Sequence, residues 1–452
     1  MTSREILQYV KEHPSGRVKI AYADIDGILR GKYMSAEKFL AAAESATSFC
    51  DVIFGWDMAD VAYDNAGYTG WHTGYPDAPA HIDLNTFRKI PWENDLPFFL
   101  GEITDTRGRA AAVCPRQLLK RAMKEADELG YRPYFSQEFE WYNFAETPQS
   151  AHEKQYRNLT PITPGMFGYS ILRTTLEQPF FNDLFDGLRN FGVPLEGLHT
   201  ETGPGTFEAA INYASLPEAG DRAVLFKTAV KEIAYRHGIM ATFMAKVNEQ
   251  LPGCGGHVHQ SLWDKEGKRN LFFDAKDKWR MSPLMKQYLA GQLYCLPYLL
   301  PLYAPTINSY KRLVEGAWAP TTITWGLDNR TVAIRVLNGG ANSCRIETRV
   351  VGADANPYLA MAAALASGLY GIKHKLRLGQ APTTGNGYRE EGNGKLPATL
   401  DEATRHMKES GLATELFGKN FAEHFIATRE WEWRQHLKPV TDWEMRRYFE
   451  II

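Results

Sequence analysis

The sequence is poor in cysteine, carries no strong excess of charge and has no long hydrophobic run. Its five cysteines are scattered along the chain and never form a Cys-x-x-Cys pair. This pattern argues against a disulfide framework and a thiolate zinc site, and it is typical of the reducing cytoplasm. The formal net charge is -2, and basic runs are absent. Nucleic acid is therefore not an expected partner.

The chain also lacks a stretch of about 18 apolar residues and an apolar segment behind its first residues, so we expect neither a membrane span nor a secretory signal. A hydrophobic content of 44% and a charged content of 23% are ordinary for a globular protein. We therefore expect a cytoplasmic protein without membrane partners. The 452 residues exceed one ordinary hydrophobic core, which predicts two domains.

The pattern of apolar residues predicts an α+β fold. Val18 to Ile25 alternates between apolar and polar residues, and Asp26-Gly27 then favours a hairpin turn before Ile28 to Met34. A loop-like stretch at residues 105–108 predicts a boundary between a small domain, 1–105, and a large domain, 106–452. In the large domain, the strands expected from the sequence include residues 135–142, 239–247 and 321–336, and strand and helix patterns alternate irregularly, which favours a largely antiparallel sheet.

Acidic residues recur in segments that are predicted to be strands. Glu138 and Glu140 fall on one face of a strand, where two carboxylates repel each other unless they are solvated or bridged by a cation. Glu201 and Glu208 flank a Gly-Pro-Gly turn that can bring them together. An ordinary solvent-facing strand is the alternative for the first pair.

Histidines and arginines follow in the same kind of pattern. His257 and His259 share one strand face directly after a glycine-rich run, although a lone histidine is more often structural. Arg345, Glu347 and Arg349 form one charged face, for which a surface ladder of salt bridges is the alternative. Further guanidinium groups suit phosphate and carboxylate recognition because their forks bind oxyanions at two points; they are Arg312, Arg330 and Arg335.

If these carboxylates and the imidazole lie close together in the fold, they indicate one common site. Five carboxylates can share a cavity only with compensating cations. Oxygen ligands with one imidazole and no thiolate favour Mg²⁺ or Mn²⁺ over zinc. Acid-bound divalent ions opposite several arginines predict a site for a nucleoside triphosphate. The residues are Glu138, Glu140, Glu201, Glu208, Glu347 and His257.

In this order and spacing, the motifs resemble those of the glutamine synthetase family, type I in length and layout, over nearly the whole chain. The matching stretches are Tyr22-Ala23-Asp24-Ile25-Asp26-Gly27 with Arg30-Gly31-Lys32, Glu138-Phe139-Glu140, Glu201 to Glu208, Gly255-Gly256-His257-Val258-His259-Gln260-Ser261-Leu262, Asn308-Ser309-Tyr310-Lys311-Arg312-Leu313, Asp328-Asn329-Arg330 with Arg335, Arg345-Ile346-Glu347-Thr348-Arg349, and Ala355-Asn356-Pro357-Tyr358.

The resemblance implies a small N-terminal β-grasp domain and a large catalytic domain of the glutamine synthetase/guanido kinase-like type. It also implies a double-ring dodecamer with active sites between subunits, ATP as a substrate, and two or three Mg²⁺ or Mn²⁺ ions in each site. In the implied reaction, the γ-carboxylate of glutamate attacks the γ-phosphate of ATP, and an amine then displaces phosphate from γ-glutamyl phosphate.

The resemblance also implies roles for single residues. Glu140, Glu201 and Glu208 match the ligands of one metal ion, and Glu138, His257 and Glu347 match those of another. The residues that match groups contacting ATP are His259, Ser261, Arg330 and Arg335. The residues that match groups holding glutamate are Gly253, Arg312 and Arg349. Arg345 matches a further arginine near the phosphates, so Arg330, Arg335 and Arg345 are the expected catalytic arginines.

The sequence departs from the family pattern where the amine is expected to bind. True glutamine synthetases have a glutamate in the flap after the Ser-Tyr-Lys-Arg motif, but Trp318 stands there in this chain. The family's Asp-Gly-Ser-Ser loop is replaced by a stretch containing Phe54, Trp56 and Asp57. Ammonium must be bound and deprotonated before attack, which favours carboxylates, whereas an indole offers an apolar wall. We therefore predict a γ-glutamyl-amine ligase that favours an apolar or aromatic amine.

Three alternatives to this prediction stay open at the sequence level. Glu315 or an N-terminal aspartate can serve as the base, which keeps true glutamine synthesis from ammonia possible. Several aspartates near residue 57 keep a polyamine substrate possible. A non-enzymatic relative is disfavoured because all six candidate metal ligands are present.

Overall fold

In the computed structural model, which describes residues 1–43, 45–105 and 107–452, the predicted hairpin forms around Asp26-Gly27. β1 (Arg17–Ala23) pairs antiparallel with β2 (Leu29–Ser35). Gly27 takes a φ of 81°, a left-handed conformation that suits glycine. The predicted boundary at residues 105–108 includes residue 106, which lies outside the described residues, and the division into two domains stays a prediction.

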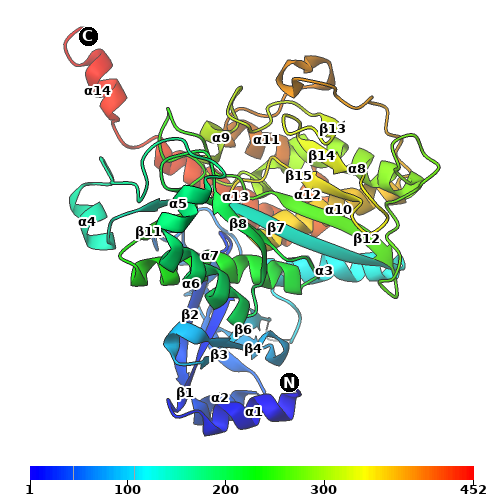
Figure 1. Cartoon of the computed structure of the whole chain (residues 1–452). Coiled ribbons are helices and arrows are strands. Elements are labelled where there is room, and N and C mark those ends of the chain that lie inside the picture. Colours follow the sequence, from blue (N-terminus) through cyan, green and yellow to red (C-terminus); the bar gives the residue numbers. More distant parts are fainter. Residues whose placement is uncertain (44, 106) are drawn as a thin grey trace.

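The first sheet belongs to the small N-terminal β-grasp unit, at the lower end of Figure 1. Its strand order is β2-β1-β6-β4-β3, with β5 paired to β6. Helices α1 (Ser3–Glu12) and α2 (Ala36–Ala42) contribute to its core, in which Ile20, Phe39 and Phe99 are fully buried. The remaining strands are β3 (Thr47–Cys50), β4 (Asp77–Ile82), β5 (Arg88–Ile90) and β6 (Leu96–Ile103).

The second sheet belongs to the large unit and is mainly antiparallel, as predicted. Its order is β13-β14-β15-β12-β7-β9-β8, with β10 and β11 also paired to β7, and β13 runs parallel to β14. The strands are β7 (Tyr131–Phe144), β8 (Leu195–Thr200), β9 (Thr206–Ile211), β10 (Ala214–Ser215), β11 (Met240–Thr242), β12 (Val258–Asp264), β13 (Trp325–Leu327), β14 (Ile334–Leu337) and β15 (Arg345–Thr348).

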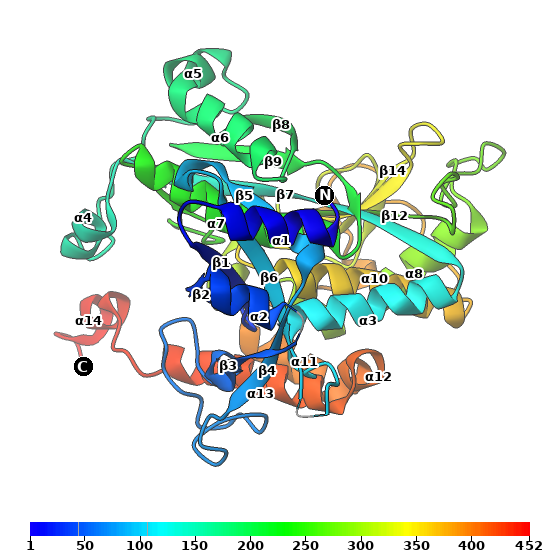
Figure 2. The same ribbon diagram turned by 90° about the horizontal axis from the view of Figure 1, so that it is seen from below.

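Helices pack on the sheet and on one another in the large unit. Figure 2 shows α3, α8 and α10 close together, and α10 packs against both α3 and α8. A side chain at Gly291 of α8 would lie 2.2 Å from the carbonyl oxygen of Ser367 in α10, so glycine permits this close crossing. The helices are α3 (Pro115–Glu128), α4 (Pro148–Glu153), α5 (Ile171–Leu176), α6 (Gln178–Asn190), α7 (Glu218–Arg236), α8 (Pro283–Leu299), α9 (Ser309–Arg312), α10 (Pro357–Lys373), α11 (Leu400–Ser410), α12 (Leu412–Phe417), α13 (Lys419–His436) and α14 (Asp442–Tyr448).

Buried polar contacts fix the β1–β2 turn to the large unit. Arg429 of α13 is buried, and its guanidinium donates to Asp26 at 2.6 Å. The Asn356 amide donates to the carbonyl oxygens of Asp24 and Ile25. Among the described residues, no helix is both long and apolar enough to cross a bilayer.

Candidate active site

Polar side chains from neighbouring strands line one face of the large sheet. Residues directly opposite each other in a sheet point to the same face, and side chains along a strand alternate between faces. The register gives the opposed pairs Arg335–Glu347, Glu347–His259, His259–Ser136, Glu140–Glu208 and Glu208–His199. Since Ser136, Glu138 and Glu140 alternate along β7, the strand acids predicted from the sequence share one face.

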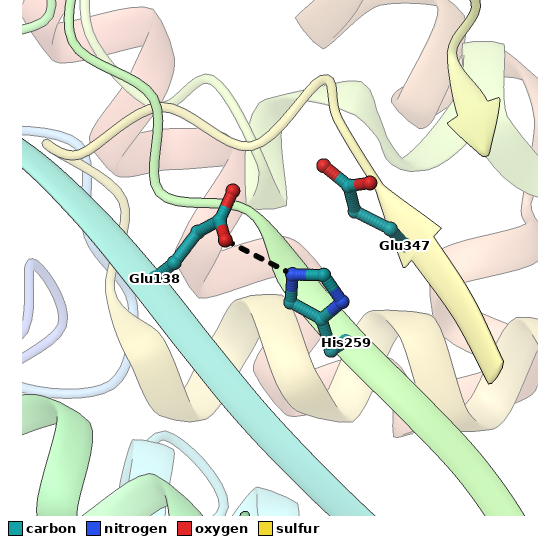
Figure 3. Close-up of side chains that lie close together, drawn as sticks. All are labelled: Glu138, His259 and Glu347. Carbon is teal, nitrogen blue, oxygen red and sulfur yellow. Dashed lines mark hydrogen bonds and ion pairs between the residues drawn. The ribbon is translucent and has the colours of Figure 1, made fainter. Parts of the chain in front are cut away.

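The first cluster joins strands β7, β12 and β15. His257 Nδ1 lies 2.7 Å from one oxygen of Glu138 and 3.4 Å from an oxygen of Glu347. His259 Nε2 lies 3.2 Å from the other oxygen of Glu138, and Figure 3 shows these two side chains beside Glu347. One ligand atom each from Glu138, His259 and Glu347 lies within 4.8 Å of the others, so these residues can hold a metal ion.

Arginines neutralise the buried acid of this cluster. Glu347 is fully buried, and its carboxylate accepts hydrogen bonds from Arg335 at 2.8 Å and from Arg349. A buried carboxylate requires such partners because the loss of hydration is costly. Arg345 donates to His259 Nδ1 at 3.2 Å and thereby orients Nε2 towards Glu138.

The second cluster lies at the β8–β9 end of the sheet. His199 Nε2 lies 3.2 Å from Glu208, and Nδ1 lies 3.8 Å from Glu201. The His199 ring stacks on Tyr169 with centroids 4.4 Å apart. His199, Glu201 and Glu208 can therefore hold a second metal ion. Glu140 lies opposite Glu208 and accepts a hydrogen bond from the Gly255 amide at 2.6 Å.

Charge is distributed unevenly over the two clusters. Burial disfavours the charged form of Glu138, but hydrogen bonds from His257 and His259 outweigh it and hold the pKa of Glu138 well below its usual range. Burial raises the pKa of Glu140 despite the nearby Arg312. Burial likewise raises the pKa of Glu208 despite its hydrogen bond with His199. The second cluster thus holds acids without enough positive charge, which is the condition that a divalent cation relieves.

A cavity of about 260 Å³ opens beside the first cluster. Its polar lining includes Glu138, His259, Ser261 and Arg345. Its aromatic lining includes Tyr134, Tyr213 and Trp263, with Tyr134 in edge-to-face contact with both of the others. An aromatic wall beside an arginine and a metal-binding cluster suits a nucleotide, whose base stacks and whose phosphates need cations.

Arg312 and Gly253 lie together behind the first cluster. Arg312 is buried; its guanidinium donates to the carbonyl oxygens of Val350 and Arg349 and lies 3.4 Å from His257 Nε2. A Cβ at Gly253 would lie 2.7 Å from the Ala245 carbonyl oxygen and from Arg312 Cγ, so any larger residue would displace this arginine.

Trp318 lies at a second cavity, of about 530 Å³, with Asp328 and Arg330. Its side chain is 63% exposed, and its φ of 56° is unusual for a bulky residue. Arg335, which donates to Glu347, also donates to Asp328. Asp328 of this cavity is therefore joined to the first cluster through one arginine.

Comparisons with known proteins identify the family. The profile of the "Glutamine synthetase, catalytic domain" family matches residues 112–448. The chain belongs to the glutamine synthetase family. It is 52% identical to the type-1 glutamine synthetase 2 of Dictyostelium discoideum over 99% of this chain and 86% of that protein. It is 37% identical to the glutamate–isopropylamine ligase of a Pseudomonas species over 99% and 98% of the two chains.

A solved structure of GmaS in complex with ADP has the same fold. The TM-score is 0.85 at 27% identity, and the alignment covers 98% of this chain and 99% of that chain. Relatives matched over most of their length thus include both a protein named as a glutamine synthetase and one named as a ligase for isopropylamine.

Three residues predicted for the amine pocket lie apart from Trp318 within one chain. Phe54 is fully buried in the N-terminal core. Trp56 lies against Arg30, and Asp57 accepts a hydrogen bond from Trp431 at 3.0 Å. Among the described residues that line the Trp318 cavity, none comes from this loop. Their assignment to the amine site stays a prediction.

His199 was not assigned a role at the sequence level. It precedes Glu201 by two residues and lies opposite Glu208, so the same-face rule that paired the acids also includes it. Burial acts against its charged form, but the hydrogen bonds to Glu208 and the Thr200 carbonyl raise the pKa of His199. Alternation along the strand is therefore the sequence signal that places His199 beside the acids.

Proposed function

We propose that this chain is an ATP-dependent ligase that joins the γ-carboxylate of L-glutamate to an organic amine through γ-glutamyl phosphate. The observation that carries the proposal is the pair of acid clusters on one sheet face, next to buried arginines and the cavity at Tyr134. The donor set of carboxylates and imidazoles fits Mg²⁺ or Mn²⁺.

Each group of residues has a part in the proposed reaction. Glu138, His257 and Glu347 would hold one metal ion, with His259 at hand as an alternative donor. Glu140, Glu201 and Glu208 would hold another, with His199 beside them. When bound, such ions withdraw charge from the transferring phosphoryl group.

Arginines would bind and orient the substrates. Arg335 and Arg345 flank the first cluster, where the ATP phosphates are expected, with Ser261 on the same cavity wall and Arg330 at the flap. Arg312, which lies against Gly253, and Arg349 are each fixed by hydrogen bonds to backbone carbonyl groups, which suits recognition of a glutamate carboxylate. Positioned charges of this kind stabilise the transition state without reorganising.

Trp318 supports an organic amine as the nucleophile. An indole cannot accept a proton from ammonium, whereas its flat face excludes water and packs against an apolar substituent. The isopropylamine ligase, at 37% identity, shows that the family includes enzymes named for an alkylamine substrate. We propose an apolar or aromatic amine.

Ammonia is the second candidate nucleophile. The relative from Dictyostelium, at 52% identity, is named as a glutamine synthetase. Glu315 stands three residues before Trp318, and a carboxylate there can serve as a base. A polyamine substrate would require several acids, for which the aspartates near residue 57 are candidates.

A substrate panel distinguishes these candidates. The purified chain is incubated with ATP, Mg²⁺, L-glutamate and, separately, ammonia, isopropylamine, aniline, ethanolamine and a polyamine, with phosphate release and the γ-glutamyl product measured. We expect isopropylamine or aniline to give the highest kcat/KM. Turnover with ammonia alone would reject the organic amine, and no turnover with any amine would reject the ligase.

Metal binding is tested without catalysis. We expect Mg²⁺ or Mn²⁺ to raise the melting temperature. An ion that binds only the folded state stabilises it by about 2.7 kcal/mol when the free ion concentration is 100 times the Kd. Two or three ions per chain are expected from equilibrium dialysis with Mn²⁺. One ion or none would contradict the proposed ligand sets.

We also propose a homododecamer of two rings, in which the loop with Phe54, Trp56 and Asp57 reaches the active site of a neighbouring subunit. The separation of this loop from Trp318 within one chain supports a contribution from another subunit. Location in the cytoplasm is supported by the five free cysteines.

A further inference from the structure

A third cavity, of about 690 Å³, lies on the opposite face of the large sheet from the acid clusters. The β1–β2 turn, α7, β11 and α13 contribute to its walls, and these elements lie near one another in Figure 1. Lys227 of this cavity lies 5.9 Å from the ring of Phe139, which alternates with Glu138 and Glu140 along β7. Among the described residues that line it, none is a predicted active-site residue.

Positive charge gathers on the α7 wall of this cavity. Lys227 and Lys231 are four residues apart and therefore share one helix face. The Phe243 ring lies 5.8 Å from each ammonium group. Lys227 donates to the Ala355 carbonyl oxygen at 3.1 Å, while burial, followed by the charge of Lys231, lowers the pKa of Lys227 to about 7. An anion beside the two ammonium groups would favour the charged form of Lys227 and offset its repulsion by Lys231.

Carboxylates also line this cavity. Asp354 accepts hydrogen bonds from Thr306 and Ser309 through Oδ2, but its buried Oδ1 accepts none from the described residues. Glu432 of α13 is a second carboxylate of the lining, and burial raises its pKa. Burial disfavours the charged form of Glu432, so a cationic group on a ligand beside it would stabilise this carboxylate.

We propose that this cavity is a second ligand site, separate from the active site, which takes a small zwitterion with one carboxylate and one ammonium group, as in a free α-amino acid. The ligand carboxylate lies between Lys227 and Lys231, and its ammonium donates to Glu432. Apolar side chains of the lining, including Met244 and Met58, accommodate the remainder of the ligand.

The site adjoins the structure that holds Arg312. Asp354 Oδ2 fixes Thr306 and Ser309 at the start of α9, and Arg312 ends this helix. A ligand in this cavity therefore lies beside Asp354, the residue that anchors the glutamate-binding arginine. The link to glutamate binding rests on the proposed function, whereas the binding of a ligand in the cavity is independent of it.

Direct binding tests the proposal in the absence of ATP and metal. L-Alanine and L-leucine are titrated into the full chain by calorimetry, alongside 4-methylpentanoate and 3-methylbutylamine, which each lack one charge of leucine. We expect at least one amino acid to bind, and the single-charge analogues to bind at least about 10-fold more weakly, because each loses a charge-assisted hydrogen bond.

Variants locate the binding site. Lys227→Met, Lys231→Gln and Glu432→Gln should each weaken binding at least about 10-fold. Arg312→Lys, in the glutamate site, and Lys419→Gln, at an exposed position of α13, should leave it unchanged. Lys231 is exposed, so its variant decides the outcome if Lys227→Met does not fold. Failure of both amino acids to bind, or binding that is lost in Arg312→Lys and kept in Lys231→Gln, would overturn the proposal.

Discussion

The acids of the site have different surroundings. Substitutions of these acids are therefore expected to differ in their effects on stability and on activity. Glu347 is fully buried between two arginines, whereas Glu201 is partly exposed and lies 3.8 Å from His199. Removing one partner of a buried ion pair costs about 3–5 kcal/mol. Glu347→Gln is therefore expected to lose both stability and activity, while Glu201→Gln loses activity alone.

Both variants should lower kcat more than about 100-fold, since even outer-shell changes at metal sites reach that range. Urea unfolding and the phosphate-release assay measure the two effects separately. Glu249→Gln, at an exposed loop position, serves as the control. Near-normal turnover in Glu201→Gln would remove this residue from the metal site.

At the residue scale, Trp318 is expected to determine which amine the enzyme prefers. We predict that Trp318→Glu raises kcat/KM for ammonia relative to the organic amine by at least about 10-fold, because a carboxylate at the flap can deprotonate ammonium. Trp318→Gln removes the indole without adding a base and is the matched control. The same change in both variants would show that the lost aromatic wall, and not the new carboxylate, causes it.

Among the elements, those set by periodicity were predicted well. The alternation in residues 135–142 placed Glu138 and Glu140 on one face, and β7 confirms the strand. A single strand predicted over residues 321–336 was wrong, since β13 and β14 are short and pair in parallel around a turn in which Asp328 has a φ of 47°. A left-handed turn at a non-glycine residue has no reliable signal in a single sequence.

The strand predicted over residues 239–247 was also too long, because β11 ends at Thr242. Beyond it, the Asn308 side chain accepts from the Lys246 amide at 2.8 Å and donates to the Lys246 carbonyl oxygen at 2.9 Å. A side chain distant in the sequence thus takes the place of a neighbouring strand. Local patterns cannot reveal such a partner.

Hydrogen bonds to Asp354 hold the start of helix α9. The prediction for this helix concerns the KM for glutamate. Asp354 accepts from Thr306 at 2.8 Å and from Ser309 at 2.5 Å, and hydrogen bonds to a charged group contribute about 1.5–3 kcal/mol each. We expect Asp354→Ala to raise the KM for glutamate at least about 10-fold through a displaced Arg312, with the KM for ATP little changed. Asp264→Asn, which alters another turn-capping carboxylate, is the control. An equal rise in both KM values would indicate general disruption.

At the scale of the whole molecule, the C-terminal segment extends away from the body, as Figure 1 shows for α14. Every residue of α14 is at least partly exposed, and the exposed apolar side chains of this segment include Trp443, Phe449 and Ile451. Its ion pair with the body, Arg157 to Asp442, lies at the surface, where such pairs contribute little. Exposed apolar side chains in such number are typical of a protein–protein contact surface, and we propose that this segment contacts another subunit of the proposed double ring.

Deletion of residues 441–452 should therefore leave the fold of each chain intact but break the proposed double ring. We expect sedimentation to report a smaller assembly, while circular dichroism shows an unchanged helix signal apart from the lost turns. Within each ring, the Phe54–Asp57 loop would still reach the active site of a neighbouring subunit. Turnover per chain should therefore fall less than about 10-fold, a smaller loss than substitution of a metal-binding acid causes. Replacing Trp443, Phe449 and Ile451 by glutamine should reproduce the deletion, and Arg446→Gln should not. An assembly of unchanged mass after the deletion would place the contact between rings elsewhere.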